Sequence, residues 1–468
     1  MPHDGNIADF EDFADAAAKL KATTAAAADT RPPEYSDDAL ALRFVDRLGD
    51  DLRYVALWSQ WLRYAGGTWR KDGTLSVIDS ARGICREAAE EVSTNKRNKR
   101  IVAALRNAKT VYAVEKLSRS DRRVAATPEQ WDMNDDGFSL DNMLLDTLTG
   151  TVRESRRDDY CTKHAGTHLD EKMPIPLWNN FLDRITAGNA DLQSYLQRVC
   201  GYCLTGLTSE HVLFFLYGNG ANGKSTFIET IAGIFGDYTV SAPMETFVEG
   251  KFDRHPTEIA GLHGARLVIA SEIESGRNWN ETRIKILTGG DTISARFMRA
   301  DFFEFTPKFK LMISGNHKPS LRSVTEAIRR RIHLIPFTVT IPPEIRDRTL
   351  AEKLKAEWPG IMAWAVRGCM EWRKTGLLPP RAVLDATDEY LKSEDALGLW
   401  IEERCVVGPA CESPSAILYS SWTIWAEGAG EKPGSQRWFS EALIDRGFRF
   451  AKVKGKRGIS GIEVRDRE

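Results

Sequence analysis

A glycine-rich loop that ends in lysine and serine is the part of this sequence with the clearest chemistry. It reads Gly218-Asn-Gly-Ala-Asn-Gly-Lys-Ser225 and matches G-x-x-x-x-G-K-[ST] without a gap. Glycines let backbone N–H groups turn inward around phosphate oxygens, and a following helix N-terminus favours an anion. In this pattern Lys224 brings a cation to the β and γ phosphates of a nucleotide, and the Ser225 hydroxyl ligates Mg²⁺. The predicted nucleotide-binding residues are Gly218, Asn219, Gly220, Ala221, Asn222, Gly223, Lys224, Ser225 and Thr226.

The segments on either side of the loop supply the context that the motif requires. The apolar run Val212–Tyr217 predicts a buried strand, and the periodicity from Phe227 to Phe235 predicts a helix. A strand, a glycine loop and a helix in this order are typical of a P-loop.

Acidic and amide side chains follow two further predicted strands. Leu267–Ala270 predicts a strand followed by Glu272 and Glu274, and the apolar segment after Phe309 predicts one that ends at Asn316. Ligands bind at the carboxyl ends of strands in open α/β sheets. Glu272 is the candidate to polarise an attacking water, with Glu274 as second choice, and Asn316 can hold that water or sense the γ-phosphate. The alternative for both acids is surface charge after a strand.

Three consecutive arginines, Arg329, Arg330 and Arg331, precede a short apolar strand. Taken alone, such a triplet is commonly a solvated or ion-paired helix end. A guanidinium from a neighbouring subunit can instead stabilise charge that develops on a γ-phosphate. The position after the other elements favours this second role for Arg330 or Arg331.

Alternating residues predict a β-hairpin between these elements. Thr292–Phe297 and Phe302–Phe305 are its expected strands, with Met298–Asp301 between them. Arg296 and Arg299 lie in this segment, where they can contact phosphates or pair with its own acids.

The N-terminal third predicts a tail and a globular unit. Residues 1–34 are Ala-rich and predict a mobile tail. In the unit that follows, Trp58 and Trp61 are expected three residues apart on a helix that Gly66-Gly67 ends. The stretch from Lys96 to Arg123 holds ten Lys or Arg and two acids. It is either a solvated face or a surface that touches phosphate.

The C-terminal part predicts helices and then a hairpin. Helices are expected at Leu397–Arg404, Ser415–Glu427 and Ser435–Arg446, followed by strands at Phe448–Lys454 and Gly458–Arg465. Three helices and a hairpin make a winged helix. Its wing is basic, and either a DNA backbone or a protein partner can use it. The wing cations are Lys452, Lys454, Lys456 and Arg457.

Composition restricts the class of protein further. The 468 residues carry a net charge of −2, which excludes a globally basic binder but allows a local basic channel. The longest apolar run is too short to cross a bilayer, so no membrane partner is expected. Seven sparse cysteines favour reduced thiols and a cytoplasmic setting.

Taken in order, these elements resemble the superfamily 3 helicases, and more narrowly the phage/plasmid primase-helicase family that includes the poxvirus nucleoside triphosphatase. The segments Lys285–Ser320 and His255–Glu272 carry the resemblance most closely, and it extends over about residues 40–465. It implies an α/β fold: an AAA+-like P-loop ATPase core, a mixed α/β N-terminal domain and a C-terminal winged helix. The expected boundaries are 1–34 (tail), 35–170 (N-terminal domain), 171–208 (helical connector), 209–341 (ATPase core), 342–396 (helical extension) and 397–468 (winged helix).

The resemblance also implies roles. The loop binds ATP and Mg²⁺, Glu272 is the Walker B acid and a metal ligand beside Ser225, Asn316 is sensor 1, and Arg330 or Arg331 is the arginine finger. Many members carry two adjacent Walker B acids, whereas Ser271 occupies the first position here. The hairpin points into the pore of a ring, where the expected DNA contacts are Arg296, Arg299 and Lys318, with Lys454, Lys456 and Arg457 on the wing.

The expected function is an ATP-dependent DNA helicase or translocase of a phage, prophage or plasmid in a bacterial cytoplasm. It acts as a ring, expected to be a hexamer, with single-stranded DNA in its pore. The chain has no room for a polymerising primase domain, so a separate primase or initiator is an expected partner. Two alternatives remain: a nucleotide-switched origin-binding protein without unwinding activity, and a P-loop ATPase that remodels protein.

Overall fold

The chain folds into two compact units. The computed structural model describes residues 32–93, 96–250, 257–271, 277–298, 301–321 and 324–465. The first unit comprises Met1–Met133 with Arg156–Thr162, and the second comprises Asn134–Ser155 with Lys163–Glu468. The expected tail falls almost entirely outside the described residues, and the expected domain boundaries stay predictions.

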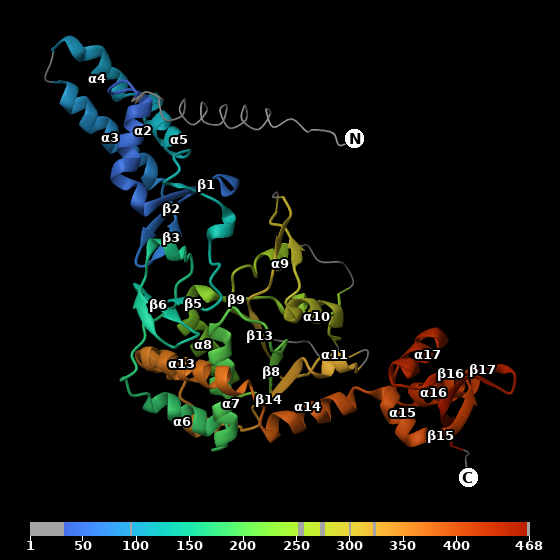
Figure 1. Cartoon of the computed structure of the whole chain (residues 1–468). Helices are drawn as coiled ribbons and strands as arrows, with labels where there is room; N and C mark the ends of the chain where they lie inside the picture. The colour runs from blue at the N-terminus through green and yellow to red at the C-terminus, as the bar shows by residue number, and fades with distance from the viewer. Residues whose placement is uncertain are drawn as a thin grey trace, which may run out of the picture. The chain divides into compact units, whose positions relative to one another are not determined.

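The first unit combines helices with a small sheet (Figure 1). Its helices are α2 (Asp37–Leu48), α3 (Ser76–Ser93), α4 (Lys99–Leu105) and α5 (Ala108–Ser118). Its sheet has the order β3-β2-β1-β4, formed by β1 (Leu52–Val55), β2 (Gln60–Ala65), β3 (Thr68–Lys71) and β4 (Ala125–Ala126).

The prediction of a helix that carries Trp58 and Trp61 is wrong. Trp58 ends a short 3-10 turn and Trp61 lies in β2, because aromatic residues fit a strand that is covered on both faces. Trp61 packs beside Phe44, whereas its neighbour Leu62 packs in a separate cluster with Trp69. Gly66 and Gly67 have φ of 60° and 80° and form the two-residue β2–β3 turn, so they end a strand and not a helix.

The second unit is built on a five-stranded parallel sheet of order β14-β8-β13-β10-β9. The strands are β8 (Leu213–Tyr217), β9 (Thr239–Ser241), β10 (Leu267–Ser271), β13 (Lys310–Gly315) and β14 (Ile332–Pro336). Phe214 and Leu216 of β8 enter one hydrophobic cluster, and Leu213 and Phe215 enter the other. Since both faces of the sheet are covered, β8, β10, β13 and β14 are largely apolar, and the prediction of these four strands is confirmed. The short strand β9 was not predicted.

Helices cover this sheet and extend it. They are α6 (Pro176–Ile185), α7 (Ala190–Leu204), α8 (Lys224–Phe235), α9 (Thr257–Ala260), α10 (Glu281–Gly289), α11 (Glu326–Arg329), α12 (Leu350–Leu354), α13 (Trp358–Thr375) and α14 (Arg381–Ser393). A small antiparallel sheet, β5 (Gly137–Ser139), β6 (Met143–Asp146) and β7 (Val152–Glu154), also belongs to this unit. The predicted hairpin is confirmed with shorter strands, β11 (Ile293–Ala295) and β12 (Phe303–Phe305).

The C-terminal elements match their prediction and add one strand. They are α15 (Ala396–Arg404), α16 (Ser415–Gly428), α17 (Gln436–Asp445), β16 (Arg449–Val453) and β17 (Lys456–Val464). The additional strand, β15 (Cys405–Pro414), pairs with β17 across a bulge between Val407 and Glu412. It was missed because half of its residues are exposed and its burial shows no regular alternation. No helix in the described part of the chain is long and apolar enough to span a membrane.

Candidate functional site

The glycine loop Gly218–Ser225 joins β8 directly to α8, and two of its glycines fit no other residue. Gly218 has φ 149°, and a Cβ there would lie 2.0 Å from the Phe337 carbonyl oxygen. Gly223 has φ 87°, and its Cβ would lie 2.5 Å from Ile185 Cγ2. The loop therefore passes so close to Phe337, which follows β14, and to Ile185 of α6 that a side chain would displace it.

We expect Gly218→Ala to lower stability by about 1–3 kcal/mol, because the added methyl group overlaps backbone that cannot move aside. Gly220→Ala is the matched control, since a Cβ at Gly220 meets nothing within 4 Å. Thermal unfolding of both variants checks this. Equal melting temperatures for the two variants would contradict the close approach to Phe337.

The Asn222 side chain stabilises the loop through hydrogen bonds to backbone carbonyl groups. Its side chain is buried, and Nδ2 donates to the carbonyl oxygens of Asn219 (2.6 Å) and Phe337 (2.8 Å). The Ala221 carbonyl in turn accepts from the Ile341 N–H at 2.8 Å. The assignment of Asn222 to the nucleotide stays a prediction, and in the structure its side-chain amide holds the loop in shape. Phe337 was not anticipated, since only its backbone carbonyl takes part and no side-chain pattern marks it.

Lys224 is buried at the start of α8 and its ammonium group faces β13. Its Nζ donates to the Gly218 carbonyl oxygen and to Asn316 Oδ1, the latter at 3.3 Å. Gly315 is the register partner of Tyr217, so the residues that follow these two strands lie side by side. Burial lowers the pKa of Lys224. No carboxylate in the described ranges pairs with this ammonium group, which leaves it suited to an anionic ligand.

The other loop residues are more accessible. Asn219, Gly220, Ala221 and Ser225 are exposed, and Thr226 is half-buried. The Ser225 hydroxyl at the first turn of α8 can ligate a cation. Ser271 ends β10 in register with Ser314, at the same edge of the sheet. Glu272 and Glu274 lie outside the described residues, so the acid and metal-ligand roles stay predictions.

The three arginines lie at the opposite edge of the sheet and differ from one another. The Arg331 carbonyl oxygen accepts from the Leu213 N–H at 2.6 Å, which puts it at the amino end of β8, roughly 16 Å of strand from the loop. Its side chain is buried, Nη1 donates to the Ala327 carbonyl oxygen (2.7 Å), and burial lowers its pKa. Arg329 pairs with Glu326 and Asp388. Arg330 is exposed, without a side-chain partner in the part of the chain that is described.

The residues expected to touch DNA fall in three places. Arg296 lies over the Phe302 ring (4.7 Å) in the hairpin and has no carboxylate partner among the residues described, while Arg299 lies outside them. Lys318 packs over the rings of Tyr217 (4.3 Å) and Tyr390 (5.6 Å), next to the glycine loop and not at the hairpin. The wing cations Lys454, Lys456 and Arg457 are exposed at the β16–β17 turn.

Fold and site define a mixed α/β protein whose parallel sheet carries a lysine-bearing glycine loop at its carboxyl edge. Residues 41–187 match the family described as D5 N terminal like, and residues 216–331 match a family of unknown function, DUF5906. The fold is similar to the apo structure of the NrS-1 C terminal region, with a TM-score of 0.50, 10% identity, and coverage of 90% of this chain and 98% of that chain.

The sequence relatives include viral proteins. A provisionally named helicase, L207/L206 of Acanthamoeba polyphaga mimivirus, is 29% identical over 59% of this chain and 31% of its own length. A second, 022R of Frog virus 3, is 24% identical over 55% and 28%. Primase D5 of Fowlpox virus is 27% identical over 32% and 20%.

The N-terminal match and the viral relatives support a D5-like primase-helicase family for this chain. The matched region spans about a fifth to a third of the curated relatives' own length. These relatives come from viruses named for eukaryotic hosts, so they do not support the expected bacterial host.

Proposed function

We propose that this protein is an ATP-hydrolysing replication helicase that moves along single-stranded DNA as a ring. The observation that carries the proposal is the buried Lys224 ammonium group, held beside Asn316 beneath an open glycine loop. Two strands that are neighbours in the sheet but far apart in sequence bring together a cation and an amide. This is the arrangement expected of a P-loop and a γ-phosphate sensor.

In this proposal the chain's own groups bind and orient the nucleotide. Backbone N–H groups of the exposed loop and the first turn of α8 bind the phosphates, and Lys224 exchanges the Gly218 carbonyl for phosphate oxygen. The Ser225 hydroxyl, together with Glu272, would hold Mg²⁺, which neutralises charge on the phosphates when bound. Asn316 orients the attacking water while keeping its amide oxygen near Lys224.

A neighbouring subunit completes the site. Arg330 is the finger we favour, because it is exposed and unpartnered among the described residues, whereas Arg331 is buried and Arg329 is ion-paired. All three arginines lie at the amino-terminal edge of the sheet, whereas the glycine loop of the same subunit lies at its carboxyl edge. Since a finger must reach a nucleotide across an interface, this position supports a ring in which each subunit serves the next, with a hexamer as the expected size.

The hairpin and the C-terminal module, which consists of α15 to α17 with β15 to β17, are the proposed DNA contacts. Phe297, Met298 and Phe302 of the hairpin are 47%, 72% and 59% exposed, and Arg296 lies beside them. Exposed apolar side chains next to a cation suit unpaired bases and their phosphates. Elements α15 to α17 with β15 to β17 form the proposed winged helix.

Two activities and one variant test the proposal. DNA-stimulated ATP hydrolysis separates a helicase from a protein-remodelling ATPase, and strand displacement separates it from a nucleotide-switched origin binder. We expect both activities with the wild-type chain, and Glu272→Gln should retain ATP binding while losing hydrolysis. ATP hydrolysis that is indifferent to DNA would contradict the proposal. A separate primase or initiator remains the proposed partner.

A further inference from the structure

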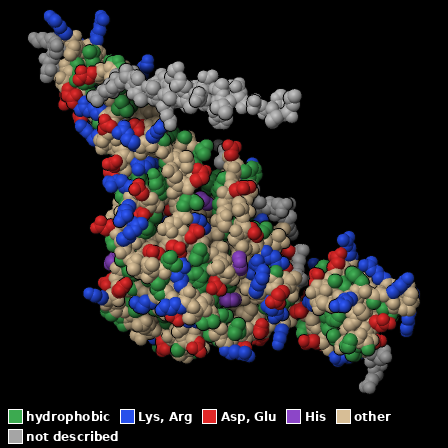
Figure 2. All heavy atoms as spheres, viewed as in Figure 1, with side chains coloured by type: hydrophobic (Ala, Val, Ile, Leu, Met, Phe, Trp, Pro, Cys, Tyr) green, Lys and Arg blue, Asp and Glu red, His purple; other side chains and the backbone are tan. Residues whose placement is uncertain are grey.

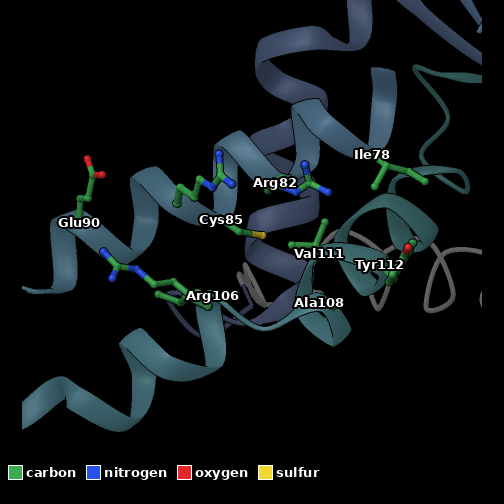
Figure 3. A pocket seen from close by; sticks show the side chains of 10 residues that line it. Ile78, Arg82, Cys85, Glu90, Arg106, Ala108, Val111 and Tyr112 are labelled. Carbon is green, nitrogen blue, oxygen red and sulfur yellow. The ribbon is translucent and has the colours of Figure 1, made fainter. Parts of the chain in front are cut away.

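A groove in the first unit lies outside everything assigned so far. It has a volume of about 500 Å³ and runs between α3 and the segment that joins α4 to α5. Figure 3 shows the Arg106 side chain extending from that segment towards α3. The Glu90 carboxylate points away from Arg106. A groove of this size accommodates a nucleotide.

The charges of α3 are divided between two faces. Glu87 and Glu91 pair with Arg47 (2.7 Å) and Arg43 (2.5 Å) of α2, so two acids of α3 are neutralised on that side. Arg82 and Arg86 line the groove on the other side. Among the residues described, Arg82 has an exposed contact with Asp79 (3.0 Å), and such contacts contribute little.

The surface around the groove carries Lys and Arg side chains that have no side-chain partner among the described residues. The two acids in the stretch 96–123 are already ion-paired. Glu115 is buried and pairs with Arg119, and Asp121 pairs with Arg123. The exposed cations without a side-chain partner in the described ranges are Arg86, Lys99, Arg100, Arg106, Lys109, Lys116 and Arg122. Figure 2 shows Lys and Arg side chains around the outer ends of α3 and α4. The surface therefore favours a polyanion.

The floor of the groove is apolar and one wall is aromatic. Cys85, Leu105 and Val111 are buried beneath it, and Tyr112 on its rim is 57% exposed. Tyr112 and the guanidinium groups of Arg86 and Arg106 line the same groove at different points along it, which suits a short single strand with a base on the ring and phosphates further along. A duplex keeps its base faces stacked, and a peptide of Asp and Glu has no aromatic ring to stack on Tyr112.

The geometry points to a second single-stranded DNA site in this groove, with a base stacked on Tyr112 and phosphates on Arg86 and Arg106. This site is separate from the hairpin and from the C-terminal module. It gives the N-terminal unit a binding role that does not depend on ATP hydrolysis.

Binding of a fluorescent oligothymidylate to the full chain tests the site. We expect Arg106→Ala to weaken binding and to reduce the slope of log affinity against log salt by about 0.7, the value for one phosphate contact on a single strand. Tyr112→Leu should weaken binding about tenfold with the slope unchanged, because stacking releases no counterions. Arg43→Ala is the matched control, since that arginine is already paired with Glu91, and it should bind as the wild type does.

A second readout identifies the position directly. An oligothymidylate that carries 5-iodouracil should crosslink to Tyr112 on irradiation. Unchanged affinity and slope in Arg106→Ala, with no crosslink to α5, would overturn the site. Equal loss of duplex binding in both variants would assign the groove to a duplex, and displacement of the oligonucleotide by polyglutamate at matched charge would make it a general anion surface. Either outcome also overturns it.

Discussion

Replacing Lys224 by alanine is expected to abolish ATP hydrolysis, with a loss of at least about 10²–10³-fold. Lys224 is buried and its ammonium group has only two oxygen acceptors, Gly218 O and Asn316 Oδ1, among the described residues. No other lysine lies in the glycine loop to replace its charge on the β and γ phosphates. Release of phosphate from ATP measures the effect.

Lys355→Ala is the matched control for this variant. Lys355 is exposed in the same unit and pairs with Glu352 at 2.7 Å, so its removal should leave hydrolysis unchanged. Thermal unfolding of both variants separates loss of chemistry from loss of fold. A folded Lys224→Ala protein that hydrolyses ATP at the wild-type rate would show that the loop is not the nucleotide site.

Arg330→Ala is expected to lower hydrolysis by about 10³–10⁵-fold, the range for an arginine finger in other phosphoryl-transfer systems. The reason is its position: it is exposed at the edge of the sheet opposite its own loop, so in the proposed ring it would act on the nucleotide of a neighbouring subunit. Mixing Arg330→Ala protein with Lys224→Ala protein should restore part of the activity. One mixed interface then pairs an intact lysine with an intact arginine.

Arg329→Ala provides the contrast at the neighbouring position. Its guanidinium group is held by Asp388 at 3.5 Å and, more loosely, by Glu326 at 3.9 Å, so we expect a much smaller effect on hydrolysis. No recovery of activity in rings shown to contain both variants would argue that Arg330 acts within its own subunit. A larger loss for Arg329→Ala than for Arg330→Ala would move the finger by one residue.

Local patterns explain why much of the second unit was predictable. β8, the glycine loop and α8 are contiguous in the chain, and strands covered on both faces become apolar runs that need no knowledge of their partners. The C-terminal helices α15 to α17 and the hairpin β16–β17 follow the same logic, since each is formed by neighbouring residues. The first unit was harder, because aromatic residues three apart fit both a helix and a two-sided strand.

By itself, the sequence determined the motif, the order of the elements and the residue types available for chemistry. Only the tertiary structure decided which groups meet. It joined Lys224 to Asn316 across neighbouring strands, and it closed the loop with a carbonyl from Phe337. It also separated three adjacent arginines into paired, exposed and buried side chains. It paired Glu87 and Glu91 of α3 and Glu115 of α5 with arginines outside the groove, so that Arg86 and Arg106 keep no side-chain partner among the described residues. These outcomes depend on contacts between residues far apart in the chain, and burial and pairing there decide which charges remain available to a ligand.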